Sequence, residues 1–190
     1  MKIIILRHGK PVIPPLNRIS PAAFPDWVTA YNNAGLSPTS TPTDEALSIA
    51  KKCNTVVCSH LARSIESASA LGFTETTLNS ALFNEAELPT VNLNHPRLSP
   101  KVWAVLLRIL WLLGYSTNSE SFKQAKIRAS EAADTLIDLA THHSSVLFIG
   151  HGVYNRILVN ELLARGWSGP KNPGTVHWSY GVYTYPSSTA

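Results

Sequence analysis

The sequence has few of the residues that mark disulfide-rich, metal-binding or membrane-spanning proteins. Cys53 and Cys58 are its only two cysteines in 190 residues, and their number and spacing indicate neither a disulfide framework nor a zinc site. The apolar segment Ser99–Leu113 is interrupted by Lys101 and Arg108 and is shorter than the roughly 20 residues that span a bilayer. We therefore expect no membrane span.

The start of the chain also lacks the pattern of a signal peptide. Its apolar stretch, Lys2–Leu6, is short and is followed at once by Arg7 and His8. Together with the small number of cysteines, this leads us to expect a soluble cytoplasmic protein.

Runs of like charge are absent as well. Lys and Arg total 16 against 12 Asp and Glu, which gives a formal net charge of +4, and the basic residues are scattered along the chain. Nucleic-acid binding would require them to be clustered, so we expect no nucleic-acid partner. The mild positive excess suits a small anionic substrate.

The length and the hydrophobic pattern predict one α/β domain over residues 1–190. An apolar fraction of 44% is ordinary for a globular protein, and a chain of this length can bury a substantial core. Short apolar runs typical of buried strands occupy Lys2–Leu6, Thr55–Cys58 and Ser145–Ile149, and an aromatic-rich stretch at Trp178–Tyr185 is a fourth strand candidate, with a weaker one at Thr76–Leu82.

Helical patterns separate these strands. They comprise a short helix capped by Thr43, a long amphipathic helix through residues 122–140, and a helix over Gly152–Ala164. This alternation predicts a three-layer α/β/α sandwich with a mostly parallel central sheet. The proline-rich segment Pro11–Pro25 is expected to be a loop. Ser99–Leu113 is expected to be a packed cap or core helix, with a helix against a partner or a membrane surface as the alternative.

Two histidines and two arginines follow the predicted strands. Arg7 and His8 end the first strand, His151 lies between the strand and the helix in GHGVYNR, and Arg63 begins the helix after the second strand. Ligands bind at the carboxyl ends of such strands, and a helix N-terminus attracts an anion. Each of these residues alone could be structural or surface-exposed, but four of them at one sheet edge indicate a phosphate site. The planar guanidinium of arginine can donate two hydrogen bonds to phosphate oxygens, and a neutral histidine can attack phosphorus as a nucleophile.

Four motifs occur in the order typical of one family. LRHGK at Leu6–Lys10, SHLARSIESA at Ser59–Ala68, NEAELP at Asn84–Pro89 and GHGVYNR at Gly150–Arg156 resemble the histidine phosphatase superfamily, with its phosphoglycerate mutase-like fold. The resemblance implies that His8 is the nucleophile that forms a phosphohistidine. It also implies that Arg7, Arg63 and His151 complete the phosphate pocket, with no metal and no cofactor.

The general acid carries over from the resemblance less directly. In the branch related to phosphoglycerate mutase, a Glu follows the third strand, and Glu85 fits that pattern, with Glu87 as the second candidate. Both could instead be solvated loop residues. The branch of acid phosphatases and phytases has an Asp directly after the second histidine, where this chain has Gly152. His60 and His177 could contact the leaving group or be structural.

These residues predict a phosphatase that hydrolyses a phosphate monoester. The alternatives are a phosphoglycerate mutase-type phosphoryl transferase, a phosphohistidine-protein phosphatase and a non-catalytic phosphate-binding module. The substrate would be a small phosphorylated metabolite or a phosphoprotein, and fold-level analogy does not choose between them. The sequence leaves the oligomeric state open, with a homodimer as one alternative.

Overall fold

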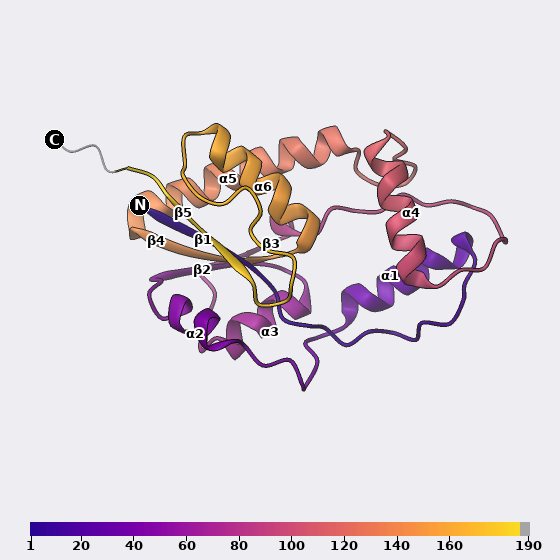
Figure 1. Cartoon of the computed structure of the whole chain (residues 1–190), viewed down its shortest axis with the longest axis horizontal. Helices are drawn as coiled ribbons and strands as arrows, with labels where there is room; N and C mark the ends of the chain where they lie inside the picture. Colours follow the sequence, from indigo (N-terminus) through magenta and orange to yellow (C-terminus); the bar gives the residue numbers. More distant parts are fainter. Residues whose placement is uncertain (187–190) are drawn as a thin grey trace.

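The centre of the structure is a twisted, mostly parallel sheet (Figure 1). A computed structural model describes residues 1–186 of the chain. The strands are β1 (Lys2–Arg7), β2 (Thr55–Ser59), β3 (Leu78–Ser80), β4 (Ser145–Gly150) and β5 (Tyr180–Thr184), and their order across the sheet is β3-β2-β4-β1-β5. Among these five strands, only β5 pairs antiparallel with its neighbour. All five predicted strands are present, and β3 and β5 are shorter than predicted.

Helices cover both faces of this sheet, which confirms the predicted α/β/α sandwich. On one face α5 (Phe122–His143) and α6 (Gly152–Ala164) bury alanine and leucine side chains against alternate strand residues such as Ile3 and Ile5. On the other face α2 (Asp44–Ala50) and α3 (Ala62–Ala70) pack against Ile4 and Leu6. This alternation follows from the two-residue period of a strand.

The prediction that Pro11–Pro25 is a loop is wrong at its end. A 3-10 turn covers Pro21–Ala23, and α1 (Phe24–Asn33) begins directly after it. Proline is compatible with the first turn of a helix because the N–H group that it lacks has no intrahelical partner there. Pro25 and Asp26 therefore lie in the first turn of a helix, where composition alone suggested an irregular segment.

Helix α4 (Pro100–Leu112) packs with α1 to form a small cap beyond the carboxyl edge of the sheet. Trp103, Leu107 and Trp111 are buried, as predicted for a packed cap helix. The opposite face of α4 is exposed and apolar, and comprises Val102, Val105, Leu106, Ile109, Leu110 and Leu112. Among residues 1–186, no helix has both the length and the apolar character needed to cross a membrane.

The register between β1 and β4 positions the residues that follow both strands. Leu6 pairs with Ile149 and Arg7 with Gly150, and the N–H group of His8 donates to the Gly150 carbonyl at 3.0 Å. His8 and His151 therefore leave the sheet side by side.

Asn155 of α6 links the same two strands. Its side-chain amide donates to the Leu6 carbonyl at 3.3 Å, and its oxygen accepts the N–H group of His151 at 2.9 Å. A Cβ atom at Gly150 would overlap this side chain, so the glycine before His151 leaves the space that Asn155 occupies.

Candidate active site

His8 and His151 are neighbours at the carboxyl edge of the sheet. Their ring centroids are 4.9 Å apart, and their exposed fractions are only 2% and 1%. Nδ1 of His8 lies 2.6 Å from the Gly9 carbonyl, which can only accept, so Nδ1 carries the proton. In the neutral ring this leaves Nε2 of His8 with its lone pair free.

The second histidine is oriented by β2. Nε2 of His151 lies 2.7 Å from Oγ of Ser59, the last residue of that strand. If the hydroxyl donates to Nε2, the proton of the neutral ring is on Nδ1, which is buried. Ser59 was not singled out from the sequence, although it begins the motif that contains Arg63.

Arg63, on the first turn of α3, is held by α1. Its guanidinium lies over the Tyr31 ring at 4.7 Å, and it donates to the Tyr31 carbonyl and to Oδ1 of Asn32, both at 3.3 Å. Its exposed fraction is 1%. Tyr31 and Asn32 were not found from the sequence, because the helix that carries them was taken for the end of a loop or left unassigned.

Arg7 approaches the same edge from β1. Its Nη1 donates to the Thr175 carbonyl. Its guanidinium lies close to the start of α6, where a Cβ atom added at Gly152 would be 3.4 Å from Cζ of Arg7. This separation corresponds to ordinary van der Waals contact, so the Arg7 guanidinium is a direct neighbour of the first residue of α6.

Three buried nitrogens at this site have no hydrogen-bond partner among the described residues. They are Nε of Arg7, Nε of Arg63 and Nδ1 of His151. Buried N–H groups in folded proteins nearly always have an acceptor, so three together at one site suit an anion with several oxygens. A tetrahedral oxyanion such as phosphate supplies acceptors of this kind.

The surroundings keep both histidines neutral near pH 7. Burial, followed by the positive charge of Arg63, lowers the pKa of His8 well below its usual value of 6.5. Burial, followed by His8 and Arg63, lowers the pKa of His151 in the same way. The neutral form of His8 is the one that can act as a nucleophile.

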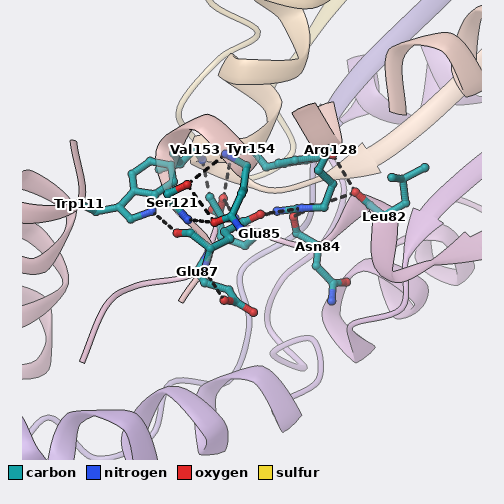
Figure 2. A network of polar contacts seen from close by, with 12 residues as sticks. Leu82, Asn84, Glu85, Glu87, Trp111, Ser121, Arg128, Val153 and Tyr154 are labelled. Carbon is teal, nitrogen blue, oxygen red and sulfur yellow. Dashed lines mark hydrogen bonds and ion pairs between the residues drawn. The ribbon is translucent and has the colours of Figure 1, made fainter. Parts of the chain in front are cut away.

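Glu85 caps the N-terminus of α6. One carboxylate oxygen, Oε1, accepts the N–H groups of Tyr154 at 2.8 Å and Ala86 at 3.0 Å, and Oε2 accepts that of Val153 at 3.1 Å (Figure 2). A carboxylate is favoured at this end of a helix by the unpaired N–H groups. Glu85 is therefore held by the N-terminus of α6, and it is not the solvated loop residue that the sequence offered as the alternative.

Glu87 faces a different part of the chain. Its Oε2 accepts the N–H group of Glu120 at 2.9 Å, and Glu120 in turn pairs with Arg128 of α5 at 2.5 Å (Figure 2). Glu87 is exposed, whereas Glu85 is partly buried. The two candidate acids are thus held by different elements, Glu85 by α6 and Glu87 by the segment before α5.

The other two candidate histidines, His177 and His60, differ in their distance from His8. His177 lies next to His8, with ring centroids 5.3 Å apart, and its Nδ1 is 3.0 Å from the His8 carbonyl. His60 is exposed, 3.4 Å from the Asn84 amide. Within residues 1–186, no three His, Cys, Asp or Glu side chains are grouped so that they could hold a metal ion.

Comparison with known proteins rests on structure alone. No protein-family model matches the sequence, and no curated protein matches it either. The fold, however, is similar to that of the product of a Mycobacterium tuberculosis open reading frame, with a TM-score of 0.64, 18% identity and coverage of 98% of this chain and 92% of the other. Such neighbours are members of the histidine phosphatase superfamily.

The chain has a phosphoglycerate mutase-like fold. A mycobacterial glucosyl-3-phosphoglycerate phosphatase matches with a TM-score of 0.58 and 17% identity, covering 95% of this chain and 88% of the other. A phosphoserine phosphatase variant of Entamoeba histolytica, in complex with phosphoserine, matches with a TM-score of 0.51 and 13% identity, covering 86% and 80%. The shared fold thus extends over most of this chain.

The two buried histidines predict how stability depends on pH. Unfolded histidine has a pKa of about 6.5, whereas the folded protein resists protonation of His8 and His151. Below about pH 6.5 the unfolded chain binds more protons, so the free energy of unfolding should fall by up to about 1.4 kcal/mol per pH unit for each histidine. Above about pH 7, His8 and His151 are neutral in the folded and in the unfolded chain, so they do not make the free energy of unfolding depend on pH.

Urea unfolding between pH 7.5 and 5.5, in phosphate-free buffer, measures this dependence. His8→Gln and His151→Gln should each give a flatter slope than the wild type. His142→Gln, a change to an exposed histidine of α5 outside the site, serves as the control for the effect of the substitution itself. A slope that stays equally steep in the His8 and His151 variants would contradict the assignment.

Proposed function

We propose that this protein is a phosphatase that hydrolyses a phosphate monoester through a phosphohistidine on His8. The observation that carries the proposal is a buried neutral histidine, with its Nε2 lone pair free, beside three buried side-chain nitrogens that have no hydrogen-bond partner among the described residues. The phosphatases among the structural neighbours support the same reaction class. A module that only binds phosphate would not require a free nucleophile at this position.

In the first step, Nε2 of His8 attacks the phosphorus atom. The N–P bond forms as the bond from phosphorus to the ester oxygen breaks, and the leaving oxygen takes both electrons of that bond. Arg7, Arg63 and His151 donate to the phosphoryl oxygens, whose negative charge they balance through the transition state. A phosphate monoester is close to dianionic at pH 7, which suits this set of donors.

Glu85 supplies a proton to the leaving oxygen in this proposal. Its Oε2 accepts only one N–H group from the described residues, that of Val153, so the oxygen has a second lone pair on which a proton can be carried. In the second step Glu85, now ionised, takes a proton from water while the water oxygen attacks phosphorus. The N–P bond then breaks, which releases phosphate and restores neutral His8.

The proposal is tested by hydrolysis of an aryl phosphate such as p-nitrophenyl phosphate. His8→Gln should lower kcat/KM by at least about 10³-fold, because the nucleophile is lost. His142→Gln, an exposed histidine outside the site, should retain the activity. Activity should persist after treatment with a chelator, because arginines supply the positive charge, and vanadate should inhibit it.

The outcome also separates the alternative reactions. Full activity of His8→Gln, or recovery only with added magnesium or zinc, would contradict the phosphohistidine mechanism. A phosphoryl transferase would return the group to a second hydroxyl of the substrate, so an assay with phosphoglycerate and bisphosphoglycerate in place of aryl phosphate would reveal isomerised product instead of free phosphate.

The assignment of Glu85 makes a second prediction. An alkoxide leaving group requires a proton, whereas a nitrophenolate does not, so loss of the acid should slow alkyl phosphates far more than aryl phosphates. In single-turnover measurements of phosphoenzyme formation, Glu85→Gln should slow an alkyl phosphate by roughly 10²–10⁴-fold. Glu87→Gln is the matched control and should show little difference between the two substrates. Equal slowing of both substrates by Glu85→Gln would mean that the residue only positions α6.

A further inference from the structure

A cavity of about 760 Å³ lies between the cap and the candidate active site. Arg63 and Glu85 belong to its lining, so it begins at the phosphate-binding arginine and the proposed general acid. It extends between α1, α4 and the segment Glu85–Thr90. A volume in this range accommodates a ligand much larger than a phosphate ion.

Aromatic rings form one wall of this cavity. Tyr31, which lies under the Arg63 guanidinium, stacks with Trp27 at a centroid distance of 5.4 Å, and Trp27 stacks with Phe24 at 6.0 Å. These residues lie on one face of α1 because they are three and four positions apart. The wall therefore leads from the phosphate-binding arginine into the cap.

Apolar side chains continue the lining away from α1. They come from the segment before α1, from the segment after β3 and from α4, and include Ile13, Leu16, Leu88, Pro89 and Ala104. Ile13 and Leu16 are partly exposed to solvent in the described structure, so an apolar ligand that filled the cavity would remove part of their surface from water.

Charged groups in the lining are mostly engaged with the protein itself. Arg108 donates to the carbonyls of Ala86 at 2.6 Å and Glu87 at 3.0 Å. Arg128 is paired with Glu120. Lys101 is exposed. The polar groups left free are thus few and lie apart from the aromatic wall: the exposed Lys101, and Oδ1 of Asn84, which has no hydrogen-bond partner among the described residues.

We propose that the cavity holds a bulky apolar alcohol, so that the substrate is the phosphate monoester of an apolar alcohol rather than of a sugar or a small hydroxy acid. The proposal rests on the phosphatase function proposed above. In the bound ester the phosphate lies at Arg63, the ester oxygen near Glu85, and the carbon skeleton against Trp27 and Leu88. Burial of the skeleton then contributes to binding and orientation.

A series of n-alkyl phosphates from ethyl to hexyl tests this, because the leaving-group chemistry is nearly constant along the series. Each methylene buried is worth about fourfold in affinity, so kcat/KM should rise by on the order of 10²-fold from ethyl to hexyl. Binding of the matching n-alkylphosphonates, which cannot be hydrolysed, should rise in parallel when measured by calorimetry. Glycerol phosphate should resemble ethyl phosphate.

Two neighbouring positions on α4 give a matched pair of variants. Ala104→Phe places a large side chain in the cavity and should abolish the rise of kcat/KM with chain length. Val105→Phe, on the exposed face of α4, should leave that rise unchanged. Circular dichroism checks that both variants are folded. Ile13→Asp, which alters an exposed lining residue, is a second variant that should reduce the gain without changing the core.

The outcomes separate the two proposals. If kcat/KM for the alkyl phosphates and the affinity for the alkylphosphonates were both independent of chain length, the proposal of an apolar substrate would be overturned, and the phosphatase function would stand. Phosphonate affinity that rises with chain length without any turnover would support the cavity and overturn the phosphatase function. A gain that survives in both Ala104→Phe and Ile13→Asp would place the alkyl chain elsewhere and overturn the inference.

Discussion

Parallel hydrogen bonding between β1 and β4 determines where both buried histidines are held. The pairing of Arg7 with Gly150 brings His8 and His151 to adjacent positions at the carboxyl edge, and Asn155 links the two strands just before these residues. A slip of one residue would turn every side chain of one strand to the opposite face, so the apolar residues of the core fix this register strongly. The same burial that stabilises the sheet therefore positions the candidate nucleophile.

The site is electrostatically unusual because positive groups surround neutral histidines. Burial lowers the pKa of His8, and the charge of Arg63, which is nearly inaccessible with its guanidinium over Tyr31, lowers it further. Without an anion, several of these donors lack acceptors among the described residues. Binding of a phosphoryl group would satisfy them and offset the repulsion among the cations, which gives a physical reason for specificity toward an anion.

Much of the central sheet could be predicted from the sequence, because short apolar runs that end in polar residues and glycine have few alternatives. Helix α1 of the cap could not be predicted in the same way, since Pro25 is as compatible with the first turn of a helix as with a loop. Contacts between residues far apart in the sequence could not be predicted either. Glu85 meets the N–H groups of Val153 and Tyr154 across nearly 70 positions, and Arg63 meets Tyr31 across about 30. The apolar cavity depends on these contacts between distant segments.

The central claim is that the phosphoryl group is carried by His8, and trapping of the phosphoenzyme tests it most directly. The wild-type protein is mixed with a phosphate monoester for milliseconds, quenched in alkali, digested and mapped by mass spectrometry. The account predicts one phosphoryl group on His8, stable in alkali and labile in acid, which appears before free phosphate and is absent from His8→Gln. A phosphoryl group on His151 or His177, or turnover by the wild type without any phosphohistidine, would contradict it.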